Sequence, residues 1–230
     1  MTNTSRLWKV LAALMVVSFG ILLYFGREIY IAAPPIPTAV KTTTGETLYT
    51  REQYDMGREV WQSVGGHQMG SIWGHGSYVA PDWSADWLHR EATALLDLWA
   101  QRDAGKAYAD LDAVQQAGLQ ARLQQTMREN TYDSATGVIT VDEDRAQAIR
   151  QVNDHYMRLF GPDVELNTLR AQYAIQQNPI PDAEQRQAMM AFFFWTSWSA
   201  STNRPDNTIT YTSNWPSEPL VGNVPTTSTY

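Results

Sequence analysis

The chain has 230 residues, and its hydrophobic content of 43% is enough to bury a core. Its formal net charge of −7 argues against nucleic acid as a partner, because nucleic-acid binding needs a basic patch. The absence of cysteine excludes disulfides, thiolate metal sites, iron–sulfur clusters and haem attached through Cys-x-x-Cys-His.

The N-terminal region predicts a transmembrane anchor over residues 7–26. Residues 10–26 carry no charge, and this run approaches the roughly 20 residues that cross a bilayer as a helix. Arg6 and Lys9 precede the run, and the long part that follows it is acidic. The positive-inside rule therefore places residues 1–6 in the cytoplasm and the remainder in the periplasm, with the anchor in the inner membrane. The alternative is a cleaved signal peptide, but no clear small-x-small cleavage site follows the apolar run.

Residues 27–50 are expected to form an extended linker, because the first part is rich in proline and the second part is polar. Helical spacing of apolar residues then predicts a mainly α domain over residues 51–200. The expected helices cover residues 51–64, 84–102, 110–129, 142–160, 166–176 and 182–200. A small β-hairpin is expected over residues 131–141. Residues 201–230 are polar, and we expect them to form an extended tail that leads to a membrane core outside the chain.

The last expected helix contains an apolar run that ends at Trp195 and is too short to span a membrane. A helix of this length without a polar face is expected to be buried on every side. Asp182 is predicted to begin this helix and Asp142 the fourth, while Asp82 or Ser84 caps the second.

The most unusual segment is residues 65–83, where five glycines occur with two histidines and two tryptophans. Glycine at this density indicates a backbone that turns tightly or approaches another group closely. His67 and His75 could form a metal pair, but no carboxylate lies between them, and the nearest along the chain is Asp82. The favoured interpretation is that each histidine holds the loop backbone through hydrogen bonds.

Known catalytic patterns are missing from the sequence, which has no phosphate-binding loop, nucleophile elbow or His-Glu-x-x-His motif. The carboxylates of residues 142–144 lie at an expected helix start, where they complement the helix dipole. His89 and His155 lie on expected helices without a partner at metal-ligand spacing. We therefore predict no catalytic residue in this chain.

Taken together, the motifs resemble those of the nitric oxide reductases of the haem–copper oxidase superfamily. In the two-subunit members, a cytochrome c subunit carries Gly-Lys-x-Leu-Trp, then Cys-x-x-Cys-His, then Gly-Glu-Gly-Ala-Tyr-x-Ala-Pro-Asp/Glu-Leu. This chain has residues 57–61, Gly65-Gly66-His67 and residues 74–83 in the same order and at similar spacing. The resemblance is to the N-terminal region of the single-chain, quinol-dependent members.

The C-terminal half resembles the same haem-carrying subunit. Ile180-Pro181 stands where that subunit has a Met-Pro ligand loop, and an aromatic helix and Asn214-Trp215-Pro216 follow. The resemblance covers nearly the whole chain apart from a helical insert at about residues 90–165. It implies a cytochrome c-like helical domain behind the anchor, with the small β-hairpin inside the insert.

The resemblance further implies that the domain has lost its haem c. The thioether attachments cannot form around Gly65, Gly66 and His67, and no Met ligand replaces the one that is missing. We expect Met69, Ile72 and Trp73, together with aromatic residues of the last helix, to fill the space, since an empty haem-sized cavity would be costly. The chain itself is then expected to bind no redox cofactor.

For the whole enzyme, the resemblance implies reduction of NO to N2O with quinol, using haem b, haem b3 and non-haem iron in a multi-helix membrane core outside this chain. The chain alone would be inactive and would cap that core. The resemblance also implies a calcium ion at the interface, with the Gly76 carbonyl and the Tyr78 side chain among its ligands. Two alternatives stay open. Tyr78 could instead be an ordinary packed aromatic, and the chain could be a membrane-tethered periplasmic binding or electron-transfer module unrelated to NO.

Overall fold

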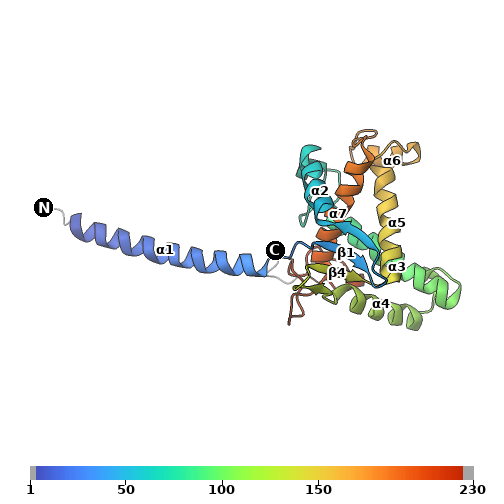
Figure 1. The fold of residues 1–230 in the computed structure, drawn as a ribbon, viewed down its shortest axis with the longest axis horizontal. Coiled ribbons are helices and arrows are strands. Elements are labelled where there is room, and N and C mark those ends of the chain that lie inside the picture. The colour runs from blue at the N-terminus through green and yellow to red at the C-terminus, as the bar shows by residue number, and fades with distance from the viewer. Residues whose placement is uncertain (1–3, 225–230) are drawn as a thin grey trace. The chain divides into compact units, whose positions relative to one another are not determined.

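The computed structural model describes residues 4–224, and the chain divides into two units, residues 1–35 and 36–230. Within the described residues the chain forms seven α-helices and one four-stranded sheet (Figure 1). The expected mainly α fold with one apolar N-terminal helix is therefore confirmed.

The first unit contains the helix α1, Thr4–Ala32, which is longer than the anchor expected over residues 7–26. At 1.5 Å per residue the helix spans about 44 Å, compared with roughly 30 Å for the hydrocarbon core of a bilayer. It is long and apolar enough to cross a membrane. The helix continues through Arg27 and Glu28, whose side chains form an exposed ion pair at 2.8 Å.

The second unit begins with two strands, so the extended linker expected over residues 27–50 is wrong for most of its length. Its first part belongs to α1, and its last part forms the strands β1, Ala39–Thr42, and β2, Thr47–Thr50. The two strands pair antiparallel, and the turn between them uses Gly45 at φ 91°. Threonine-rich strands of four residues carry too little apolar alternation to be recognised from the sequence.

The expected hairpin over residues 131–141 is present as the strands β3, Tyr132–Asp133, and β4, Val138–Val141. It does not stand alone, because β4 pairs parallel with β1. The sheet order is therefore β2-β1-β4-β3. Val40 and Ile139 are register partners in the parallel pair, and both are buried in the core.

Six helices follow α1, and each lies close to a segment expected from the sequence. Their bounds are α2 Arg51–Ser63, α3 Trp83–Ala104, α4 Ala113–Arg128, α5 Glu143–Leu159, α6 Asn167–Gln172 and α7 Ala183–Ser201. Asp82, Asp142 and Asp182 cap α3, α5 and α7 by accepting backbone N–H groups of the first turn, as the sequence predicts.

Helix α7 forms the centre of the domain, and its side chains from Ala188 to Ser201 are buried. This confirms the expectation that the helix is covered on every side. Figure 1 shows α2 and α7 side by side, and Gly57 makes their close approach possible. A Cβ at this position would lie 2.0 Å from the carbonyl oxygen of Ala188, so only glycine fits.

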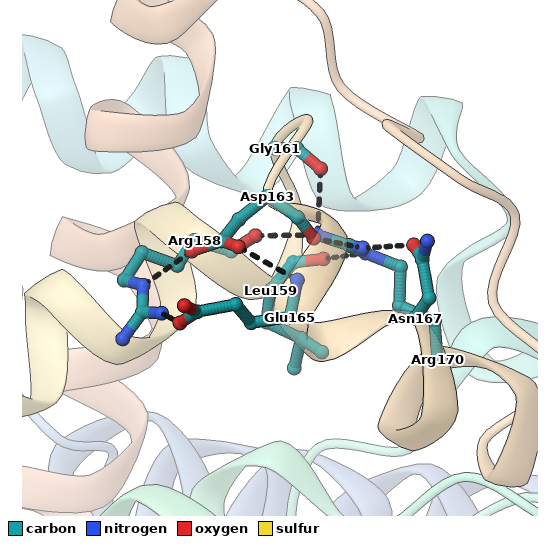
Figure 2. A network of polar contacts seen from close by, with 7 residues as sticks. All are labelled: Arg158, Leu159, Gly161, Asp163, Glu165, Asn167 and Arg170. Atoms are coloured by element: carbon teal, nitrogen blue, oxygen red, sulfur yellow. Dashed lines mark hydrogen bonds and ion pairs between the residues drawn. The ribbon is translucent and has the colours of Figure 1, made fainter.

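The turn after α5 is held by Arg170 of α6, whose side chain is 2% exposed (Figure 2). Carbonyl groups at the C-terminal end of a helix lack partners within the helix, and a cation nearby satisfies them and complements the dipole. The guanidinium donates to the carbonyl oxygens of Arg158, Leu159, Gly161 and Asp163 at 2.5–2.8 Å and to Asn167 Oδ1 at 2.7 Å.

The described part of the C-terminal segment, up to residue 224, is folded rather than extended, so the tail expected over residues 201–230 is wrong there. Short β-bridges join Asn203 to Thr210 and Glu218 to Asn223. The Asn223 amide donates to the Ala200 carbonyl at 2.8 Å, which joins the segment to the end of α7. Residues 225–230 lie outside the described part.

Arg128 at the end of α4 holds this segment together. Its guanidinium donates to the carbonyl oxygens of Thr208 and Val221 and to the side-chain oxygens of Asn214 and Asn223. Burial lowers the pKa of this guanidinium below its usual value. These contacts join positions 80 to 95 residues apart in the chain, which explains why the polar composition alone suggested an extended tail.

Candidate functional site

The glycine-rich segment forms a loop between α2 and α3, and its two ends meet. Ser71 and Asp82 form a parallel bridge, and the Trp83 N–H donates to the Ser71 carbonyl at 2.8 Å. A short 3-10 helix, Gly66–Met69, precedes this closure. The loop between Ser71 and Asp82 is therefore tied at its base to the start of α3.

The buried carboxylate of Asp82 organises the inside of this loop. Its Oδ2 accepts the Ser71 hydroxyl and the Gly74 N–H, both at 2.7 Å. Its Oδ1 accepts the Ser84 hydroxyl and, at 3.0 Å, the Ala85 N–H that makes the helix cap. A buried carboxylate needs several donors to offset its lost hydration, and Asp82 has four.

The hydroxyls that donate to Asp82 also accept hydrogen bonds from two further backbone N–H groups of the loop. Ser71 Oγ accepts the Gly76 N–H at 2.8 Å, and Ser84 Oγ accepts the Trp73 N–H at 3.0 Å. One side chain therefore holds three loop N–H groups, one directly and two through serine hydroxyls. The sequence suggested Asp82 as a helix cap, but nothing in it signalled the role of Ser71 or Ser84 as relays.

The loop tip, residues 76–80, is a tight turn with an exposed end. The Ser77 N–H donates to the Ala80 carbonyl at 2.9 Å, and Gly76 has a φ of 85°. A Cβ on Gly76 would lie 2.9 Å from the Ala80 carbonyl oxygen, so glycine is required by both conformation and space. Tyr78 is fully exposed, which makes the packed-aromatic alternative wrong within the described part of this chain.

His67 and His75 each lie against a different aromatic side chain. The His67 ring is exposed and meets Trp61 edge-on at 4.9 Å, while the His75 ring meets Trp215 at 4.8 Å. Hydrogen bonds from these histidines to the loop backbone, which we expected, are not among those of the described residues. Within residues 4–224, no group of three or more His, Asp or Glu side chains could hold a metal ion.

The region that resembles a haem attachment site turns sharply and packs on aromatic rings. Gly65 and Gly66 have φ values of 123° and 53°, a conformation that favours glycine. Met69, Ile72 and Trp73 are only partly buried at the edge of the core.

Trp83, which the sequence did not mark as a core residue, is fully buried. It stacks on Phe193 of α7, and the adjoining Gly70 is so close that a Cβ would lie 2.2 Å from the Trp83 Nε1. The only local sign of its burial was its position one residue after a helix cap. The first turn of a helix has a buried side as well as an exposed one, so this position is compatible with burial without requiring it.

Comparison with known proteins bears on whether the chain is part of a nitric oxide reductase or a membrane-tethered module unrelated to NO. The family model that describes the NorB cytochrome c-like domain of nitric oxide reductase matches residues 37–217, from the sheet to the C-terminal segment. The chain belongs to this family. Membership makes the domain part of a membrane oxidoreductase and argues against a tethered module unrelated to NO. A comparison with curated protein sequences finds no match.

Within this family match lie the whole glycine-rich loop, the sheet and helices α2 to α7. The match includes Ile180, the position at which the resemblance described above places the Met-Pro ligand loop of haem-carrying relatives. Ile180 is 1% exposed and belongs to the hydrophobic core of this domain. Its carbonyl accepts the Arg186 guanidinium at 2.5 Å, so this position has a packing role here.

Proposed function

We propose that the chain is the membrane anchor and periplasmic cap domain of a quinol-dependent nitric oxide reductase. The whole enzyme would convert two NO and one quinol to N2O, water and quinone, and the catalytic centre would lie in a multi-helix membrane core. Haem b, haem b3 and non-haem iron would belong to that core. The apolar helix α1 supports the anchor role, and its basic N-terminal flank favours a cytoplasmic N-terminus in the inner membrane.

The observation that carries quinol dependence is a cytochrome c-like domain without cysteine. Haem c is attached through two cysteines, so this domain cannot carry a covalent haem. Without that haem, the domain provides no relay from a soluble electron donor. Electrons would then come directly from quinol in the membrane.

The side chains also fit poorly around a haem. His67 is exposed against Trp61, Ile180 is a buried core residue that offers no ligand atom in its side chain, and Trp83 lies stacked within the core. Inserting a group of this size would displace several packed rings, and overpacking of a core is already destabilising at the level of single methylenes. We propose that the domain binds no haem and has a structural role.

Calcium fits this chain only as part of a shared site. Calcium takes six to eight oxygen ligands, and backbone carbonyls are common among them. Gly76 and Tyr78 would supply a carbonyl and a phenol from an exposed turn, while the nearby Asp82 carboxylate is committed to four donors inside the loop. We propose that the remaining ligands come from the membrane core, so the isolated chain should bind calcium weakly or not at all.

The test of quinol dependence uses the enzyme that contains this chain together with its membrane core. NO consumption is measured with a reduced quinol and, separately, with reduced cytochrome c. We expect turnover with quinol but not with cytochrome c, and no haem c in the pyridine haemochrome spectrum. Turnover with cytochrome c but not with quinol would contradict the proposal. The isolated chain should consume no NO with either donor.

The test of the loop tip compares Tyr78→Ala with Val79→Ala, its exposed neighbour. Removing the phenol should lower both the calcium that the purified enzyme retains and its NO turnover, by on the order of tenfold if Tyr78 is an interface anchor. Val79→Ala should leave both within about twofold, since few interface residues carry large energies. Wild-type calcium content and turnover in Tyr78→Ala would remove Tyr78 from the interface.

A further inference from the structure

We propose that Asp82 is a positioning residue for the docking contact of the loop tip, and that it acts through Ser71. This inference rests on the proposed function, because it concerns the turn that would meet the membrane core. Asp82 is 6% exposed and Tyr78 is fully exposed. An effect of the buried carboxylate on the exposed phenol therefore has to pass through the backbone of the loop between them. The route runs from Asp82 Oδ2 to the Ser71 hydroxyl at 2.7 Å and from Ser71 Oγ to the Gly76 N–H at 2.8 Å.

The two peptide groups that flank Gly76 are both held. The N–H of Gly76 is held by Ser71, and the N–H of Ser77 is held by the Ala80 carbonyl at 2.9 Å. The Gly76 carbonyl belongs to the same planar peptide as the Ser77 N–H, and in a trans peptide the two groups point in opposite directions. The Gly76 carbonyl therefore points away from Ala80, out of the turn.

A helix cap alone does not require this arrangement. Asp112 and Asp182 cap α4 and α7 by accepting N–H groups of their own helices. Asp82 makes the same kind of cap with Oδ1, but its Oδ2 is used entirely by the loop, through Ser71 and Gly74. The second oxygen therefore serves the loop conformation in addition to the helix start.

The contact of Asp82 with Ser71 matters because a fully exposed side chain such as Tyr78 has little packing to hold its position. An interface pays a free-energy cost for ordering each mobile segment, and a preorganised turn reduces that cost. The two glycines make the turn possible, since a Cβ on Gly74 would lie 2.8 Å from Ser71 Oγ. The Ser71–Asp82 pair then selects one conformation from those that glycine allows.

The experiment compares Ser71→Ala with Ser84→Ala in the enzyme that contains its membrane core. Both variants remove a hydroxyl that donates to Asp82, but Ser71 leads to Gly76 and Ser84 leads to Trp73. Ser71→Ala keeps the Asp82 cap on Ala85, so it tests positioning without removing the start of α3. We expect calcium retention and NO turnover to fall on the order of tenfold in Ser71→Ala, the size of an interface-anchor effect, and to stay within about twofold in Ser84→Ala.

A double-mutant cycle separates positioning from a general structural effect. If Ser71 acts through the loop tip, Ser71→Ala should add almost nothing once Tyr78→Ala is present. Independent effects would multiply, giving a loss on the order of a hundredfold in the double variant, and would overturn the inference. Amide hydrogen exchange on the full chain in detergent gives a readout independent of activity, and Gly76 should exchange at least about tenfold faster in Ser71→Ala than in Ser84→Ala.

The outcomes also distinguish this inference from the proposed function. If Tyr78→Ala lowers calcium retention and turnover while Ser71→Ala does not, the docking role stands and the positioning role of Asp82 is overturned. If Tyr78→Ala keeps wild-type values, the docking role fails and the positioning inference fails with it. Equal Gly76 exchange in both serine variants would overturn the positioning inference alone.

Discussion

The indole of Trp83 lies parallel to the ring of Phe193, with centroids 5.8 Å apart and planes at 13°. Tyr156 and Phe160 of the α5 region meet the same indole edge-on, at 6.0 and 5.3 Å. All four side chains are fully buried. Since protein interiors are packed as densely as organic crystals, this cluster resists the insertion of a large prosthetic group.

We therefore predict that restoring the attachment motif will not restore a haem. The double substitution Ser63→Cys and Gly66→Cys creates Cys-x-x-Cys-His with the existing His67. It should give no stable six-coordinate haem after expression with the cytochrome c maturation system, because Gly66 has a φ of 53° and aromatic rings pack beside the motif. The visible spectrum and the pyridine haemochrome provide the measurement. A normally folded six-coordinate product, with or without Ile180→Met, would show that the core can make room.

Arg170 and Arg158 offer a matched comparison of a buried and an exposed arginine in one network (Figure 2). Arg170→Met should lower the free energy of unfolding by about 2–4 kcal/mol, because several buried carbonyl groups lose their donor. Arg158→Met should cost much less, since its ion pairs with Asp163 and Glu165 involve a half-exposed guanidinium that solvent screens. Urea denaturation of the unit formed by residues 36–230 measures both. Equal losses would contradict the role given to Arg170.

Glu91 and Arg145 form an ion pair at 2.7 Å in which both side chains are buried. Glu91 also accepts the Trp87 indole N–H at 2.9 Å. Glu91→Gln should lower the free energy of unfolding by about 3–5 kcal/mol, because it leaves the Arg145 charge buried without its counter-ion.

The control for this pair is Glu46→Gln, which removes an exposed partner of Arg150 and should cost no more than about 1 kcal/mol. The double variant Glu91→Leu with Arg145→Met should recover much of the loss, as apolar replacements of buried ion pairs often do. Urea denaturation measures each variant. A double variant less stable than Glu91→Gln would contradict this account.

His155 should make the domain less stable as the pH falls. Burial and the nearby Arg90 lower its pKa from 6.5 to about 4, while Asp86 opposes and Arg158 reinforces the shift. Above pH 6.5 the ring is neutral in both states and contributes nothing. Below that pH the unfolded chain takes up the proton first, so stability falls and levels off below pH 4. Allowing for partial exposure of the ring, the loss should be about 1–2 kcal/mol.

The measurement compares wild type with His155→Gln in urea at pH 7.5 and pH 4.5. The variant lacks the titrating ring. Its free energy of unfolding should therefore rise relative to that of wild type when the pH is lowered from 7.5 to 4.5. A difference that is the same at both pH values would show that the His155 ring titrates normally in the folded state.

The helices were predictable because their signals are local. Asp142 and Asp182 begin helices where the sequence placed them, and the apolar run that ends at Trp195 is buried on all sides as its length and composition indicate. The strand structure of the threonine-rich segment after α1 was not predictable, because β1 is stabilised by β4, a strand far away in the sequence. The C-terminal segment escaped prediction for the same reason, since Arg128 holds it from another helix.

The candidate site was predictable in its location but not in its chemistry. Glycine density marked the loop, and the resemblance singled out Gly76 and Tyr78. The commitment of Asp82 to the loop depends on Ser71 lying beside it across an eleven-residue separation. A single sequence carries no signal for such a contact, because serine and aspartate are common in any polar loop.

The parallel pairing of β1 with β4 has a consequence for synthesis. About 95 residues separate the two strands, so at roughly 5–20 residues per second β1 leaves the ribosome about 5–20 s before its partner. During that interval the β1–β2 hairpin has an open edge, and in the sequence it follows closely on the apolar helix α1. Lys41 on β1 is suited to this interval, because a lysine on an unpaired edge discourages association with other strands. Slower translation between β1 and β4 would therefore lengthen the time during which this edge is exposed.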